Sequence, residues 1–162
     1  MSVDSKDFLT WKDRYSVGIS SIDEQHKDLV QMLNRLHKTM VLKRGKLAMR
    51  VIIYHLVEHT KTHFLHEEKL MQAANYPGLD IHKKNHENLI IEIQKLQRDV
   101  DYENLTMTFD LLNFIKSWLI NHITNSDKPL GVYLKKNSAL AKNLDLSGET
   151  PKIVKKRWWK FW

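Results

Sequence analysis

The chain has 162 residues, which suits a single domain, and it contains no cysteine, which excludes disulfides, thiolate metal sites and cysteine nucleophiles. The net charge of +7 would favour nucleic-acid binding, but five basic residues lie in residues 152–162, which contain no acid. The other 21 basic and 19 acidic residues nearly balance, so we expect no nucleic-acid partner. The polar N-terminus and the lack of an apolar run of about 20 residues predict a cytoplasmic protein without a membrane span.

Apolar residues recur at the spacing of one helix face in four successive segments. These faces hold Ile22, His26, Leu29, Leu33, Leu36 and Met40; Ile52, Leu56, His59, His63, Glu67 and Leu70; His82, His86, Leu89, Ile93, Leu96 and Val100; and Leu112, Ile115, Leu119 and His122. Breaks at residues 43–45, 75–78 and 101–104 separate the segments. We predict an all-α, up-down-up-down four-helix bundle over residues 1–134. Its N-terminal arm, residues 1–18, carries Trp11 and Val17, which we expect to close over one end.

Polar residues on apolar faces are unexpected, because burying one without a partner costs about 1–3 kcal/mol. The polar residues that need a partner for this reason are His26, His63, Glu67, His82, His86, His122 and Asp127. Residues four apart, such as His63 and Glu67, stack on one helix face about 5–6 Å apart, which suits metal chelation. Asp127 follows His122 by five residues, and we expect the helix to end near Pro129 and so turn Asp127 inward.

Five histidines and two carboxylates are too many for one structural zinc site, which takes four ligands in a closed tetrahedron. Imidazole with carboxylate suits iron, and the number of ligands suits two ions. If both irons are six-coordinate, then five histidines, two bridging carboxylates and one oxo or hydroxo bridge leave one position open on one iron. We therefore predict a di-iron centre whose vacancy accepts a small diatomic ligand.

The other four histidines have different expected roles, because a single histidine on an apolar face is more often a core residue than a ligand. We expect His37, His55 and His66 at the surface or its boundary. His59 lies one turn before His63 on the same face, and we expect it to be buried in a packing or supporting role.

The order and spacing of these residues resemble those of the hemerythrin family, and most closely its single-domain bacterial members, the bacteriohemerythrins. The resemblance covers roughly residues 8–134 and rests on five stretches of sequence. They are Trp11 with Ser16-Val17-Gly18; Ile22-Asp23-Glu24-Gln25-His26; residues 59–68 (HTKTHFLHEE); Tyr76-Pro77 followed by His82 and His86; and Trp118-Leu119-Ile120-Asn121-His122-Ile123 with Asp127. None of the seven candidate ligands departs from the family pattern.

The resemblance implies two iron ions, joined by an oxo or hydroxo bridge, that bind dioxygen. In that arrangement the fully coordinated iron is held by His82, His86 and His122, the iron with the vacancy by His26 and His63, and both by Glu67 and Asp127. The side chains expected to line a dry oxygen pocket are Leu29, Phe64, Trp118, Leu119 and Ile123.

Reversible dioxygen binding for carriage, storage or delivery is the predicted function, and we assign no catalytic residue. The alternatives are a di-iron redox enzyme, such as a peroxidase or nitric-oxide reductase, and an oxygen sensor that acts through a partner. Nitrogen ligands outnumber carboxylates five to two, and no further acid lies on an inward face to donate protons, which favours carriage over catalysis. The sequence leaves the oligomeric state open.

Residues 135–162 form a predicted C-terminal extension, with a short helix near residues 138–144, a linker at 147–151 and a basic, aromatic tail at 152–162. The candidate membrane-contacting residues are Lys155, Lys156, Arg157, Trp158, Trp159, Lys160, Phe161 and Trp162. Aromatic rings favour the membrane interface, and each basic residue near anionic lipid contributes about 1 kcal/mol. We predict a peripheral anchor on the inner face of the membrane, with a membrane-bound oxidase or oxygenase as candidate partner. The alternatives are a tail packed on the bundle or on a partner protein, and a tail that stays in solvent or touches nucleic acid.

Overall fold

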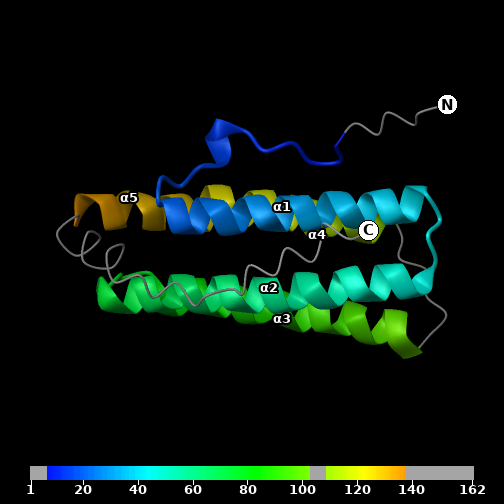
Figure 1. Ribbon diagram of the computed structural model, residues 1–162. Coiled ribbons are helices and arrows are strands. Elements are labelled where there is room, and N and C mark those ends of the chain that lie inside the picture. The colour runs from blue at the N-terminus through cyan, green and yellow to red at the C-terminus, as the bar shows by residue number, and fades with distance from the viewer. Residues whose placement is uncertain (1–6, 103–108, 138–162) are drawn as a thin grey trace.

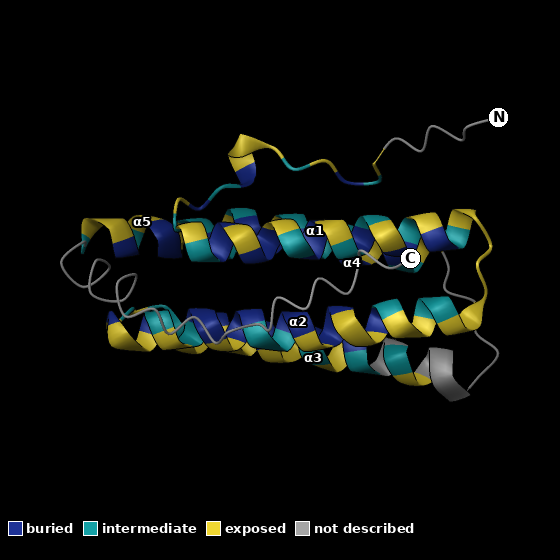
Figure 2. Ribbon diagram, viewed as in Figure 1, coloured by how far each residue is buried: buried dark blue, intermediate teal, exposed yellow. Residues whose placement is uncertain are grey.

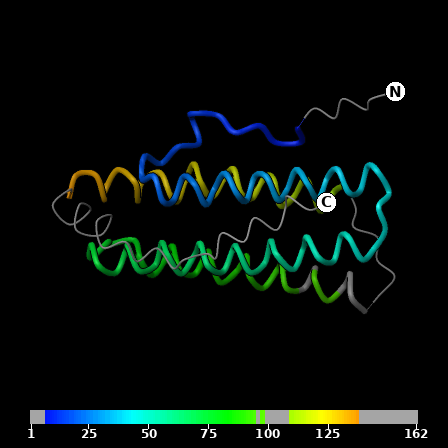
Figure 3. The backbone as a smooth tube through the Cα atoms, viewed as in Figure 1, coloured from blue at the N-terminus to red at the C-terminus, as the bar shows by residue number. Residues whose placement is uncertain are grey.

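The computed structural model describes residues 7–102 and 109–137, and every regular element in these ranges is helical. The elements are η1 (Asp13–Tyr15), α1 (Ser20–Val41), α2 (Lys46–Ala73), α3 (Leu79–Tyr102), α4 (Phe109–His122), η2 (Ile123–Asp127) and α5 (Lys128–Lys136). Four long helices run alternately up and down, with α1 beside α4 and α2 beside α3 (Figures 1 and 3). The predicted up-down-up-down bundle is confirmed.

The core follows from the apolar faces of the four helices. Residues with buried side chains recur at three- and four-residue intervals and turn toward the bundle axis, while exposed residues cover the outside (Figure 2). Ile22, Leu33, Leu36, Ile53 and Leu112 are almost completely buried and contribute to one continuous core. Packing of these faces, rather than intrinsic helix propensity, is what stabilises helices of this kind.

The connections begin where the backbone leaves helical geometry. Lys43 and Gly45 have φ values of 49° and 89° in the link between α1 and α2, and Asn75 has a φ of 50° just after α2. Such left-handed conformations end a helix, and they are costly for residues other than glycine and asparagine. Lysine is therefore an unusual residue for the left-handed backbone conformation at position 43.

The end of the fourth helix differs from the sequence prediction. We expected helix termination near Pro129 to turn Asp127 inward, but the chain stays helical through η2 and continues as α5. Residues 123–127 form a π-helical turn, in which i→i+5 hydrogen bonds add about one residue to the turn. The wider turn brings Asp127 onto the same face as His122, five residues earlier. Pro129 sits in the first turn of α5, where its missing N–H costs little.

Hydrogen bonds with the side chains of Asp23 and Asn34 in α1 hold the N-terminal arm on the bundle. The Asp23 carboxylate accepts bonds from the Ser16 hydroxyl and from the Val17 backbone N–H, at 2.5 and 2.7 Å. The Asn34 side chain both donates to and accepts from the Leu9 backbone, each at 2.8 Å. A Cβ added at Gly131 in α5 would lie 2.3 Å from the Val17 carbonyl oxygen. The arm therefore lies along the side of α1, from Leu9 beside Asn34 to Val17 against α5, and does not close over one end as expected (Figure 1).

Several predictions fall on parts of the chain outside the described residues. They include the short helix near 138–144, the linker at 147–151 and the tail at 152–162. The domain boundary after residue 134 stays a prediction, and α5 runs across it to Lys136. Among the described residues, no helix combines the length and the apolar content needed to cross a bilayer.

Candidate metal centre

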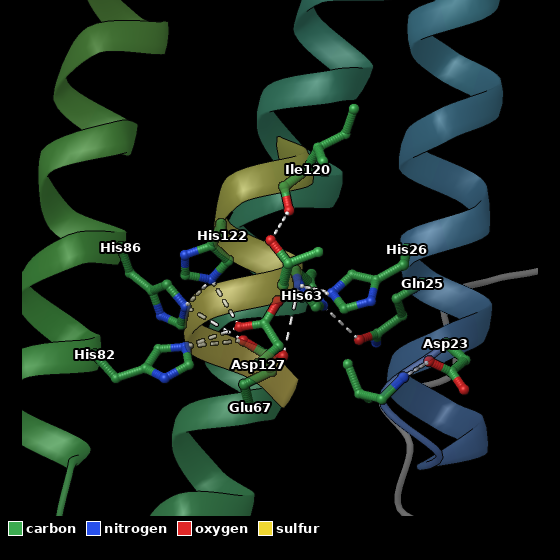
Figure 4. Close-up of polar contacts among 12 residues, drawn as sticks. Asp23, Gln25, His26, His63, Glu67, His82, His86, Ile120, His122 and Asp127 are labelled. Atoms are coloured by element: carbon green, nitrogen blue, oxygen red, sulfur yellow. Dashed lines mark hydrogen bonds and ion pairs between the residues drawn. The ribbon is translucent and has the colours of Figure 1, made fainter. Parts of the chain in front are cut away.

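All seven side chains that the sequence singled out as ligands point into one buried site between the helices (Figure 4). Helix α1 contributes His26; α2 contributes His63 and Glu67; α3 contributes His82 and His86; and α4 with η2 contributes His122 and Asp127. Their exposed fractions range from 0 to 4%, so none is solvated. The structure thus brings together every predicted ligand, and metal binding by them stays a prediction.

The ligand atoms form two groups that share the two carboxylates. The larger group combines Glu67 and Asp127 with His82, His86 and His122, and the smaller combines the same acids with His26 and His63. Within each group the ligand atoms lie within 4.8 Å of one another. A three-histidine group therefore stands beside a two-histidine group.

Each carboxylate directs one oxygen toward each group. Glu67 Oε2 lies 3.2 Å from His86 Nε2, whereas its Oε1 lies 3.8 Å from His63 Nε2. Asp127 Oδ1 lies 3.0 Å from His122 Nε2, whereas its Oδ2 lies 3.2 Å from His26 Nε2. This is the orientation that two carboxylates bridging a pair of cations require.

The electrostatics of the site favour ionised acids. Burial alone would raise the pKa of the Glu67 carboxyl, as would Asp127, but attraction to His63 and the other imidazoles outweighs both and lowers it. Burial opposes ionisation of Asp127 in the same way, but attraction to His122 holds its pKa well below the ordinary value. Burial also lowers the pKa of His63 to about 3, which keeps this imidazole neutral and able to bind a metal.

The polar atoms at the centre have no satisfactory partners in the protein alone. Both oxygens of Glu67, both of Asp127 and His82 Nε2 are buried and lack a hydrogen-bond partner. The Nε2 atoms of His26 and His63 face each other at 3.1 Å, as do those of His86 and His122 at 3.2 Å. Converging lone pairs and unpaired buried anions are costly unless cations lie between them. The donor set therefore fits two metal ions of the kind that imidazole and carboxylate bind.

Two further side chains orient the histidines from outside the site. The His63 Nδ1–H donates to Gln25 Oε1 at 3.0 Å, and the His86 Nδ1–H donates to Glu68 Oε1 at 3.0 Å. Such bonds fix the tautomer so that Nε2 faces the metal. The three-histidine group thus has a charged supporting residue, and the two-histidine group a neutral one. The sequence alone did not predict these roles, although both residues directly adjoin a ligand in the chain.

The remaining described histidines lie outside both ligand groups. His59 is buried, donates to the Gln25 carbonyl oxygen at 3.3 Å and has its pKa lowered mainly by burial. His55 is exposed, and His37 stacks on Phe8 with ring centroids 4.7 Å apart. His66 is buried rather than at the surface or its boundary as expected, and its Nε2 lies 3.0 Å from the Ser21 hydroxyl.

An apolar cavity of about 20 Å³ adjoins the site, which is room for one small molecule. Four of the predicted pocket residues line it, namely Leu29, Phe64, Trp118 and Leu119, together with the ligands His63 and His122. Ile123 is buried but does not line the cavity. The lining also includes Leu33, Leu56, Thr60, Leu89, Ile93 and Ile115, which the sequence marked only as core or left unassigned.

The fold and the site define a class, the metal-binding four-helix bundles. The hemerythrin HHE cation binding domain matches residues 17–133, and the chain belongs to the hemerythrin family. A bacteriohemerythrin of Pseudomonas aeruginosa is 37% identical over 123 residues, covering 74% of this chain and 76% of that one. A bacteriohemerythrin of Stenotrophomonas maltophilia is 33% identical over 126 residues, covering 74% and 77%. The crystal structure of a wild-type hemerythrin superposes with a TM-score of 0.74 at 28% identity, covering 78% of this chain and 98% of that one.

Metal-free protein is expected to lose stability in acid. The native pKa of His63 is about 3 and the unfolded value about 6.5, so between about pH 6 and pH 4.5 only the unfolded chain gains this proton. The free energy of unfolding should fall by about 2 kcal/mol from this residue alone. Below that range the lowered pKa values of Glu67 and Asp127 add a further loss. Urea unfolding of chelator-treated protein at several pH values measures the effect.

The matched variants for this measurement are His63→Gln, which removes the buried group, and His55→Gln, which changes an exposed histidine on the same helix. The first should flatten the acid dependence and the second should not. An unchanged slope in His63→Gln would contradict the assignment.

Glu68→Gln should weaken metal binding by roughly 10-fold or more, because His86 loses a charged supporting residue that raises its basicity. Competition with a chromophoric chelator measures the affinity. Glu58→Gln is the control, since Glu58 is an exposed acid on the same helix that pairs with Lys61. Equal affinities of the two variants would show that the bond to Glu68 does not support the site.

Proposed function

We propose that this protein binds dioxygen reversibly at a non-haem di-iron centre, for oxygen carriage, storage or delivery. The observation that carries the proposal is the unequal division of histidines around two shared carboxylates. One ion held by three histidines has its positions filled, and the other, held by His26 and His63, keeps one position for a small ligand. The apolar cavity reaches His63, a ligand of that second group.

In this proposal His82, His86 and His122 hold the filled iron, while Glu67 and Asp127 bridge the pair. Bound there, a pair of ferrous ions would supply the redox chemistry for reversible dioxygen binding. The protein fixes the ligands, because Gln25 and Glu68 hold the rings of His63 and His86 in one tautomer.

Aromatic rings keep the site dry. Phe64 stacks on the His86 ring with centroids 3.7 Å apart and planes within 3°, and Trp118 stacks on His122 at 4.5 Å. Both rings also line the cavity. Water at this position would promote oxidation of the irons, so a tightly packed apolar lining favours reversible binding.

The cavity lining also favours carriage over catalysis. Among the described residues, those that line it include no carboxylic acid, and Thr60, its only hydroxyl, donates to the Leu56 carbonyl oxygen at 2.7 Å. A redox enzyme that cleaves a bound oxygen molecule needs a group that delivers protons to it. The lining offers no acid for that purpose.

Anaerobically reduced protein should develop an iron charge-transfer band when oxygen is admitted and lose it when oxygen is removed, over repeated cycles. Metal analysis should give two irons per chain. Irreversible oxidation within the first cycle would contradict carriage, and zinc or a single iron per chain would contradict the di-iron centre.

A matched pair of variants distinguishes the effect of the cavity lining on oxidation from the loss of stability that removing any buried side chain causes. Leu119→Ala enlarges the cavity beside His122, whereas Leu130→Ala removes another buried leucine side chain that does not line it. Both should lose stability, by about 2–5 kcal/mol. Only Leu119→Ala should oxidise faster during the cycles, because water then reaches the site.

We also propose that the basic, aromatic tail anchors the protein to the membrane surface and so places it near a membrane-bound oxidase or oxygenase. The support is the composition of residues 152–162, which hold five basic residues, three tryptophans and a phenylalanine without any acid. The full chain should sediment with anionic vesicles more strongly than a chain ending at residue 151. Equal sedimentation of the two forms would refute the tail anchor.

A further inference from the structure

Exposed apolar side chains gather at one end of the bundle, around the link between α1 and α2. The described residues include eleven large hydrophobic side chains that are exposed, and five of them fall within residues 41–54. These five are Val41, Leu42, Leu47, Val51 and Tyr54, with exposed fractions from 40 to 74%. We call residues 38–54 the hairpin tip. It lies at the end of the bundle opposite α5 (Figure 1).

The five exposed apolar side chains of the hairpin tip do not contribute to the core. Leu47, Val51 and Tyr54 follow one another at four- and three-residue steps, so they share one face of α2. The opposite face of the same turns carries the buried Ile53 and Leu56, which pack in the bundle. The first turns of α2 are therefore apolar on two sides, while the bundle uses only one.

The hairpin tip is also basic. Residues 35–57 contain six lysines and arginines and no acid. Lys46 and Arg50 interact with other groups of the protein, so the charge argument rests on Lys38, Lys43 and Arg44, which are exposed. Lys43 has a backbone φ of 49°, a conformation in which asparagine or glycine would be less strained than lysine.

The described acids at this end of the bundle lie outside α1 and α2. Asp7 of the N-terminal arm directly precedes Phe8, whose ring stacks on His37, and the first turn of α4 includes Asp110. Within the described part of the chain, positive charge and exposed apolar surface thus coincide at this end on the α1–α2 side.

We propose that the hairpin tip docks on an anionic lipid bilayer. An anionic bilayer satisfies both features at once, because headgroups attract lysine and arginine while the interface takes up leucine, valine and tyrosine. A two-fold contact between copies of this chain would oppose like charges at the same patch. A nucleic acid would leave the aliphatic side chains without a partner. This docking does not depend on the oxygen chemistry or on the tail.

The geometry also lets the tip and the tail reach one bilayer. The described chain ends at Asn137, at the opposite end of the bundle, and 25 residues follow it. Fully extended, they span about 80 Å, whereas the 28 residues of α2 span about 42 Å. Residues 138–162 are therefore long enough for the tail to reach the end of the bundle where the hairpin tip lies.

Fluorescence of a dye attached at a single site tests the docking. Because the chain contains no native cysteine, an introduced cysteine is labelled at that site alone. Full-length Leu47→Cys and Val132→Cys carry an environment-sensitive dye at two exposed aliphatic positions at opposite ends. With phosphatidylcholine vesicles containing about one-third phosphatidylglycerol, the dye at 47 should shift to the blue and the dye at 132 should not. Neither should shift with phosphatidylcholine alone. A dye at 47 that stays in water while the protein sediments with vesicles would overturn the proposal and leave the tail as the only contact.

A matched pair of triple variants measures the contribution to binding. Lys43→Asn/Arg44→Gln/Leu47→Gln removes two charges and one aliphatic side chain from the tip, and asparagine suits the backbone at 43. The control, Val132→Gln/Lys135→Gln/Lys136→Gln, makes the same kind of change on exposed residues of α5. The tip variant should bind anionic vesicles at least about 10-fold more weakly than the control, with or without residues 152–162.

Equal binding of the two triple variants would overturn the proposal. So would a salt-dependent dimer in sedimentation velocity without vesicles that the tip variant alone abolishes, because the tip would then be a protein interface. Oxygen cycling should be the same in both variants, so failure of docking and failure of the oxygen proposal are separate results.

Discussion

Two carboxylates at the centre of the bundle set the requirement that the rest of the structure meets. Glu67 and Asp127 are completely buried, and none of their oxygens has a hydrogen-bond partner. An isolated buried anion costs several kcal/mol even after relaxation, so a bundle without compensating charge would exclude them. Each of the four helices places at least one imidazole near these carboxylates. The order of the helices determines which ring lies near which oxygen. Two cations between these side chains would thus stabilise the core as well as serve the proposed function.

The sequence was informative wherever burial and periodicity act together. The helix faces, the convergence of the seven candidate ligands and four of the cavity-lining residues could be predicted, because histidines at four-residue spacing on an apolar stripe are costly to bury unless they bind something. The π-helical turn at residues 123–127 was missed, since its i→i+5 bonds leave no compositional signal and Pro129 pointed to a helix end. Gln25 and Glu68 were missed because a polar residue next to a ligand looks like any other until the neighbouring helix is placed.

The two metal positions differ in their surroundings as well as in their ligand number. Glu68 adds negative charge behind a histidine of the three-histidine group, whereas Gln25 supports the two-histidine group without charge. Negative charge behind an imidazole increases its donation to the metal. Under the proposed function, the three-histidine group would therefore hold its iron more firmly, and the two-histidine group, with neutral support, would be the one that exchanges a ligand.

The π-helical turn links the metal site to the N-terminal arm through the phase of one helix. Each residue rotates an α-helix by about 100°, so the single additional residue in this turn sets the direction of every side chain after it. The residues that it orients include Asp127 in the site and Gly131, whose lack of a side chain lets Val17 approach. A deletion of one codon within residues 123–127 would displace both at once. The candidate ligand and the contact that holds the N-terminal arm are inherited together, so a lineage that lost this turn would lose both in one step.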